Sequence, residues 1–231
     1  MKKKSETIEL RDKIFNLITE KLSSYGFKLK NKCEIIKKCN DGFVQKIYYT
    51  GNIDKIDKRI YITLHVNVYN TKVDKLVAQF TDFNIPWPIL NIGYLMPCQF
   101  YNQWPISTED DIPNKIDSII TNVVEYGIPF MDSLSNNNTI INTLEEHPYI
   151  GVPIRAYLLP LMYYLYINKE MALDYIAYYT NMYKASFEEM QANNDCFWDI
   201  PSTPIENKDS INYGIYVENL KRIMAEGKTL K

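Results

Sequence analysis

The sequence predicts an α+β fold, with an antiparallel meander sheet of about four strands flanked by helices and followed by an all-helical C-terminal portion. Three observations support this fold class. Residues 60–69 alternate between apolar and polar side chains, helical periodicity flanks the sheet region on both sides, and residues after 138 keep helical spacing almost to the end. Helices before and after a run of strands are typical of the α+β class.

The first helix precedes the sheet. Ser5, with acidic residues in the turn that follows it, is typical of a helix start, and Gly26 supplies a left-handed stop. Between them one face carries apolar side chains at helical spacing: Leu10, Ile14, Leu17, Ile18 and Leu22.

Three shorter strands are expected beside the one at 60–69. Residues 33–38 and 43–49 have strand composition, and Asp41-Gly42 between them favours the positive φ angles of a tight hairpin. Residues 89–95 follow two prolines, which predicts a strand at a sheet edge.

The strand at 60–69 has two rows of side chains on opposite faces, because only a β-strand has a period of two. Its apolar row is Ile60, Ile62, Leu64, Val66 and Val68, and its polar row is Tyr61, Thr63, His65, Asn67 and Tyr69. We expect the apolar row to be buried and the polar row to face the open side of the sheet.

A second helix is predicted after the sheet. Thr108, followed by three acidic residues, is typical of an N-cap, and Gly127 is expected to end the helix. Both helices should pack on the apolar sheet face. Residues 135–138 have linker composition, so the sequence predicts a sheet domain over 1–134 and a helical extension over 139–231.

The extension is predicted to contain three helices. They run from Pro153 to about Ile167, from Ala172 through Met190, and over 210–225. The longest apolar run, residues 156–167, is interrupted by Pro160 and is shorter than the roughly 20 residues that a membrane helix requires.

Charge and cysteine spacing limit the partners and the compartment. The net charge is -2 with acids and bases interspersed, so the positive field that drives nucleic-acid binding is missing. The four cysteines have neither C-x-x-C spacing nor the density of a disulfide scaffold, and no apolar segment follows the basic start. We therefore expect a cytoplasmic protein with reduced thiols that binds neither nucleic acid nor membranes.

Glycine spacing excludes the common phosphate-binding and nucleophile motifs. The eight glycines are never closer than the nine positions between Gly42 and Gly51. This spacing rules out G-x-G-x-x-G, G-x-x-x-x-G-K and G-x-S-x-G together. The two histidines, His65 and His147, have no metal-ligand spacing, so no cofactor and no metal are predicted.

Two local patterns remain as candidate sites. In Glu145-Glu146-His147, the carboxylates could raise the pKa of the imidazole for acid–base work, although Pro148 also fits a helix end with a histidine near the terminal carbonyls. The second candidate is a binding platform, since tyrosine is enriched in interface hot spots. It consists of the polar row Tyr61, Thr63, His65, Asn67 and Tyr69. The alternative explanation for these tyrosines is a chain rich in Lys, Ile, Asn and Tyr throughout.

Several short segments, in this order and spacing, resemble a family of uncharacterised bacterial domains sometimes found beside polymorphic-toxin immunity genes. They are Gly26-Phe27-Lys28, the strand from Tyr61 to Tyr69, Ile92-Gly93-Tyr94-Leu95, Trp104-Pro105-Ile106 and Ile128-Pro129-Phe130, within about residues 8–135. The resemblance implies the helix, antiparallel sheet, helix order and a binding role, with no catalytic residues to transfer.

The expected function is therefore a non-catalytic protein-binding module, an immunity or accessory protein of a bacterial toxin system. Its alternative is a hydrolase or small-ligand enzyme with a site between the sheet and the helical portion. That site would use His65 with Glu145, Glu146 and His147.

Overall fold

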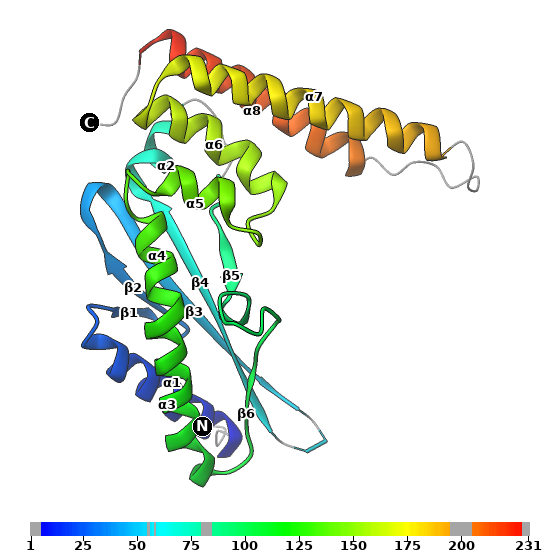
Figure 1. Cartoon of the computed structure of the whole chain (residues 1–231). Coiled ribbons are helices and arrows are strands. Elements are labelled where there is room, and N and C mark those ends of the chain that lie inside the picture. Colours follow the sequence, from blue (N-terminus) through cyan, green and yellow to red (C-terminus); the bar gives the residue numbers. More distant parts are fainter. Residues whose placement is uncertain (1–5, 55, 58, 80–84, 195–204, 228–231) are drawn as a thin grey trace. The chain divides into compact units, whose positions relative to one another are not determined.

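The computed structural model describes residues 6–54, 56–57, 59–79, 85–194 and 205–227, with side chains except for those of 183–212 (Figure 1). The chain divides into two compact units. Unit 1 comprises Met1–Thr71 and Trp87–Thr139, and unit 2 comprises Lys72–Pro86 and Ile140–Lys231. Each unit is described by itself below.

Unit 1 contains an antiparallel sheet flanked by helices, which confirms the α+β class. Within the described residues the sheet has six strands in the order β1-β2-β3-β4-β5, and β6 also pairs with β4. The strands are β1 (Lys28–Asn31), β2 (Glu34–Lys38), β3 (Phe43–Ile53), β4 (Ile60–Asn70), β5 (Ile89–Asn91) and β6 (Trp104–Ile106). The long strands β3 and β4 pair over their whole length, with Tyr48 opposite His65 and Tyr49 opposite Leu64.

The sheet differs from the prediction at its short strands. β1 and β6 were not expected, and the strand expected over 89–95 is limited to β5. The chain leaves the sheet after Asn91 because the side chain of Asn91 accepts a hydrogen bond from the backbone of Gly93 and starts the 3-10 turn η2 (Ile92–Tyr94). The predicted turn between β2 and β3 is confirmed as the 3-10 turn η1 (Asn40–Gly42), in which Asp41 has φ 54° and Gly42 has φ 86°.

Helix α1 (Glu6–Ser23) precedes the sheet as predicted. The predicted cap, Ser5, lies outside the described residues. Gly26 has φ 89°, which confirms its left-handed stop. The apolar stripe of α1 is buried at Ile14, Ile18 and Leu22.

The second predicted helix begins at Thr108 but does not end at Gly127. The turn η3 (Glu109–Asp111) leads into α3 (Ile112–Asn122), then a π-helical turn η4 (Val123–Gly127) and α4 (Ile128–Leu134). The side chain of Asp111 accepts from the backbone of Thr108 at 2.9 Å and of Ser107 at 2.8 Å, which caps this start. Gly127 was wrongly predicted as a stop, because its φ is -70° and the helix continues through it.

The core of unit 1 lies between these helices and the apolar row of β4. Ile60, Ile62, Leu64, Val66 and Val68 are all fully buried, as expected. α1 contacts β3 and α4 contacts β4 on this face (Figure 1), so both predicted helices pack on the apolar side of the sheet. A Cβ at Gly127 would lie 3.3 Å from Val66 Cγ1 and 3.3 Å from Ile92 Cδ1, so this glycine lets the helix approach the sheet closely.

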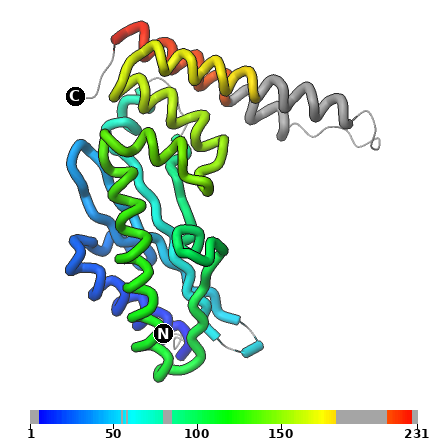
Figure 2. Tube along the Cα trace, viewed as in Figure 1, coloured from blue at the N-terminus to red at the C-terminus, as the bar shows by residue number. Residues whose placement is uncertain are grey.

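Unit 2 is helical. It contains α5 (Ile140–Glu146), α6 (Val152–Tyr166), α7 (Lys169–Asn194), α8 (Ile205–Ala225) and most of α2 (Thr71–Val77), which begins at the unit boundary. Figure 2 follows α5, α6 and the first part of α7 along the Cα trace. The three predicted helices of the extension are confirmed as α6, α7 and α8. The part of the predicted α7 stripe from Tyr183 to Met190 lies outside the described side chains.

None of the described helices is both long and apolar enough to cross a membrane. Three of the four cysteines, Cys33, Cys39 and Cys98, are free thiols. The fourth, Cys196, lies outside the described residues.

Candidate functional site

The polar row of β4 lies on the sheet face opposite α1 and α4. Directly paired residues of antiparallel strands share a face. The β3 partners of the row therefore lie on this face too: Tyr48 beside His65, Lys46 beside Asn67, and Thr50 beside Thr63. Tyr49 points to the other face, where it is buried and its hydroxyl hydrogen-bonds the Thr19 hydroxyl at 2.8 Å.

Only part of this row is open. Tyr61, His65 and Tyr69 are half-buried, whereas Thr63 is 0% and Asn67 5% exposed. Gln103 Nε2 donates to Thr63 Oγ1 at 3.0 Å, and Asn67 Nδ2 donates to the Pro88 carbonyl at 2.8 Å. Thr63 and Asn67 therefore hold the chain segments on either side of β5 against the sheet, instead of facing solvent as the alternation suggested.

The segment between β5 and β6, residues 92–103, is fixed by one buried side chain. Asn91 Oδ1 accepts from the backbone N–H groups of Gly93 and Asn102, both at 2.9 Å, and Asn91 Nδ2 donates to the Asn102 carbonyl at 3.2 Å. A Cβ at Gly93 would lie 2.1 Å from the Phe100 carbonyl oxygen, so only glycine fits this loop closure.

The loop places Tyr101 on the open sheet face, beside His65. The ring centroid of His65 lies 6.2 Å from that of Tyr48 and 6.2 Å from that of Tyr101. We call these three residues the Tyr48–His65–Tyr101 cluster. Its two tyrosines are exposed, Tyr101 by 48%, and Ile89, which pairs with Asn67 on the same face, is exposed by 57%.

His65 is the only ionisable imidazole in unit 1. Burial lowers its pKa below the ordinary value, so the ring is neutral at neutral pH. Its Nδ1 is buried and has no hydrogen-bond partner among the described residues. The cluster therefore presents uncharged aromatic surface.

Tyr101 and Ile89 were not predicted as site residues from the sequence. Ile89 begins a three-residue strand and Tyr101 lies in the loop after it, and neither segment has an alternation long enough to assign a face. The adjacent aromatic residues Phe100 and Tyr101 were a sequence signal that could have indicated Tyr101, but no such signal marks Ile89.

The second candidate, Glu145-Glu146-His147, lies in unit 2 at the end of α5. Arg155 Nε donates to the Leu144 carbonyl at 2.7 Å and Arg155 Nη2 donates to the His147 carbonyl at 2.8 Å, which caps the helix end. Burial, and then the Arg155 charge, lower the pKa of His147. The expectation that neighbouring carboxylates raise this pKa was therefore wrong, because burial disfavours the charged ring and the Arg155 cation adds to this effect.

Glu145 is joined to two tyrosines that lie far along the chain. Its Oε1 accepts a hydrogen bond from Tyr163 Oη at 2.8 Å and another from Tyr175 Oη. The rings of Tyr163 and Tyr175 stack with centroids 4.6 Å apart. Burial, followed by the neighbouring Glu145, raises the pKa of Tyr175, so both phenols stay neutral donors to the carboxylate.

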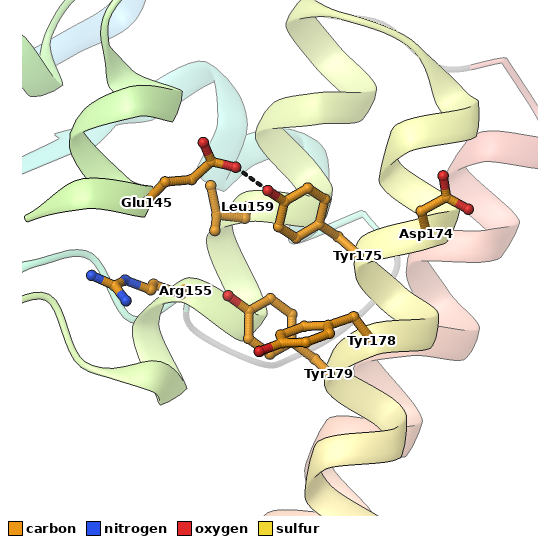
Figure 3. A pocket seen from close by; sticks show the side chains of 7 residues that line it. All are labelled: Glu145, Arg155, Leu159, Asp174, Tyr175, Tyr178 and Tyr179. Atoms are coloured by element: carbon orange, nitrogen blue, oxygen red, sulfur yellow. Dashed lines mark hydrogen bonds between the residues drawn. The ribbon is translucent and has the colours of Figure 1, made fainter.

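A pocket of about 490 Å³ adjoins this carboxylate (Figure 3). The described residues that line it come from α5, α6 and α7 and are Glu145, Arg155, Leu159, Asp174, Tyr175, Tyr178 and Tyr179. Neither Glu146 nor His147 is among them. His65 belongs to unit 1, whereas Glu145, Glu146 and His147 belong to unit 2. Among the described residues no three His, Cys, Asp or Glu side chains gather as metal ligands.

Comparison with known proteins gives limited similarity. No family model matches the chain. The chain is similar to the tryptophan synthase alpha chains of Thermoanaerobacter sp. (strain X514) and Thermoanaerobacter pseudethanolicus (strain ATCC 33223 / 39E), in each case with 26% identity over 141 residues, 53% of this chain and 53% of the relative. The chain thus spans about half the length of these curated relatives. No solved structure matches.

Proposed function

We propose that this protein is a non-catalytic protein-binding module and that its partner docks on the Tyr48–His65–Tyr101 cluster. One observation supports this most strongly. Unit 1 buries its apolar row completely on one sheet face, yet leaves tyrosine rings and Ile89 exposed on the other. Exposed aromatic and aliphatic side chains that gather on one rigid surface are typical of interaction sites.

The composition of the cluster favours a protein partner. Tyrosine buries a large area with only two side-chain torsions to order, which makes it an efficient contact residue. Lys46, which lies on the same face, is 3.5 Å from the Glu34 carboxylate, so its charge is offset in part by an acid that also pairs with Lys30 at 3.8 Å. This favours a protein over a nucleic acid, whose phosphates require uncompensated cations.

We further propose that the partner is a bacterial toxin and that the protein acts in the cytoplasm as an immunity or accessory protein. The resemblance of residues 8–135 to domains found beside immunity genes supports the kind of partner. The free thiols of Cys33, Cys39 and Cys98 support the compartment, because reduced cysteines are typical of the cytosol.

Site-specific photo-crosslinking in the native host tests this proposal. A photoreactive phenylalanine at Tyr101 is expected to crosslink one protein reproducibly. The same group at Tyr25, which is exposed by 40% in the turn after α1, serves as the matched control and is expected to give no such product.

The crosslinked protein, once identified and purified, is then titrated with the purified chain by calorimetry. Tyr48→Ser combined with Tyr101→Ser is expected to weaken binding at least tenfold, and Tyr25→Ser to leave it unchanged, because contact tyrosines contribute on the order of 1–2 kcal/mol each. Equal crosslinking at both positions, or an unchanged Kd in the double variant, would contradict docking on this face.

A further inference from the structure

The pocket beside Glu145 has the size and lining of a small-ligand site. Its volume of about 490 Å³ falls within the range of roughly 300–1,000 Å³ that is typical of such sites. Aromatic and aliphatic side chains make up most of its wall, and of its three charged residues Glu145 is the one that Figure 3 shows bonded to a tyrosine hydroxyl of the wall.

Helix α7 provides the aromatic wall. Tyr175, Tyr178 and Tyr179 lie three and four residues apart and therefore share one helix face, from which the rings project toward α5 and α6 in Figure 3. The rings of Tyr178 and Tyr179 have centroids 5.0 Å apart and planes at 74°, so their faces turn in nearly perpendicular directions. The Tyr175 ring stands 6.2 Å from that of Tyr179.

Tyr178 is the exposed member of this wall. Its side chain is 60% exposed, whereas Tyr179 is buried. A ring that packs on one neighbour and leaves its other surface open at a pocket can cover a bound ligand. A cation gains most from such rings when it lies over a ring face within about 6 Å of the centroid.

The charged groups at the pocket give it a negative balance. Two carboxylates, Glu145 and Asp174, and one cation, Arg155, line it. Arg155 directs Nε and Nη2 to the carbonyl oxygens at the end of α5 and forms no ion pair with a described carboxylate. In Figure 3 the Arg155 guanidinium and the Asp174 carboxylate both point away from the tyrosine rings, which leaves Glu145 as the charged group directed at them.

Of the Glu145 carboxylate, only Oε2 is left to accept from an N–H group of a ligand. Glu145 Oε1 already accepts from two tyrosine hydroxyls, and Leu159 lies beside it in the wall. A primary ammonium would need several acceptors for its three N–H groups. A methylated ammonium needs none, and binds through its charge and its contact with ring faces.

We propose that this pocket binds a methylated ammonium group, with Tyr175, Tyr178 and Tyr179 as its aromatic wall and Glu145 as its counter-charge. The group could belong to a free small molecule of the choline type or to a methylated lysine of a peptide. Both present the same trimethylated cation to the pocket, and the experiment distinguishes them.

Titration of the full chain by calorimetry tests the proposal. Tetramethylammonium and choline are expected to bind saturably. 3,3-Dimethylbutanol, which has the shape of choline without its charge, should bind at least fivefold more weakly, because the cation–π and carboxylate attractions require charge. A peptide with trimethyl-lysine, compared with its unmodified form, forms the second arm. Tighter binding of that peptide than of choline indicates a protein source, and the reverse indicates a small molecule.

Two variants locate the binding. Tyr178→Ala removes an exposed ring, so it should leave the fold unchanged and weaken choline binding at least fivefold. Glu145→Gln removes the charge and keeps an acceptor for a tyrosine hydroxyl, and should have a similar effect. Tyr25→Ala, at an exposed tyrosine of unit 1, is the control and should bind choline as the parent chain does.

Three results would overturn the proposal. They are the absence of saturable binding of either cation at about 50 mM, equal affinity for 3,3-dimethylbutanol, and unchanged affinity in a folded Tyr178→Ala variant. Should Glu145→Gln unfold in circular dichroism, Tyr178→Ala still decides the outcome.

Discussion

Gly93→Ala tests whether the loop over the open sheet face is as tightly closed as the structure shows. The added Cβ would lie 2.1 Å from the Phe100 carbonyl oxygen, 2.6 Å from Asn102 Cβ and 2.7 Å from Asn102 N. Two of these three neighbours are backbone atoms, which cannot rotate away as the end of a flexible side chain can. The loop must therefore move or remain strained.

The expected loss in the free energy of unfolding can be worked out for each of these two outcomes. A strained loop that stays in place costs about 1–3 kcal/mol, the range for overpacking a dense interior. A loop that moves loses the three hydrogen bonds of Asn91, each worth about 1 kcal/mol. The two costs are alternatives and are not added, so we expect a loss of about 2–3 kcal/mol in the free energy of unfolding of unit 1.

Urea unfolding followed by tryptophan fluorescence measures this loss. Trp87 and Trp104 both belong to unit 1, and a Trp198→Phe background removes the third tryptophan, so the emission reports on unit 1 alone. Gly214→Ala is the matched control. A Cβ there meets no atom within 4 Å and the residue belongs to unit 2, so the unit 1 transition should not shift.

A loss below about 0.5 kcal/mol in Gly93→Ala would refute the close approach of loop and sheet. It would also refute the position of Tyr101, because the same loop carries Tyr101 to His65.

Three further predictions concern the core, the histidines and the thiols. Leu64→Ala should cost about 3–5 kcal/mol in urea unfolding because Leu64 is fully buried, whereas Ile89→Ala on the exposed face should cost less than about 1 kcal/mol. Burial lowers the folded-state pKa of His65 and His147, so the unfolded chain takes up protons first as the pH falls. Stability should be constant between about pH 7 and 9 and decline as the pH falls below about 6.5, with a smaller decline in His65→Gln, as urea midpoints across this range would show. Thiol titration of the denatured protein without reductant should find Cys33, Cys39 and Cys98 reduced, and a disulfide between any two of them would contradict their free state.

The sequence by itself determined the features that depend on a few neighbouring residues. The period of two at 60–69 predicted which row of β4 is buried, and all five members of that row are. Gly26 and Asp41-Gly42 predicted positive φ angles because their chemistry makes such angles accessible wherever they occur. The α+β class followed from the order of these local patterns.

Other features depended on contacts between distant segments, which only the tertiary structure decides. Glycine is the residue type that commonly ends a helix, but at Gly127 it lies in close contact with Val66 and Ile92 and the helix continues through it. Thr63 and Asn67 belong to the predicted open row, yet the segments around β5 cover them.

The candidate sites show the same division. Residue type singled out His65 and Glu145, but their neighbours were not predictable from spacing. Tyr101 lies beside His65 because Asn91 holds the loop that carries Tyr101. Tyr175 donates a hydrogen bond to Glu145, although 30 residues separate the two in the sequence. No local pattern encodes such pairs, because the free energy that selects them comes from the packing of whole elements and not from the propensity of single residues.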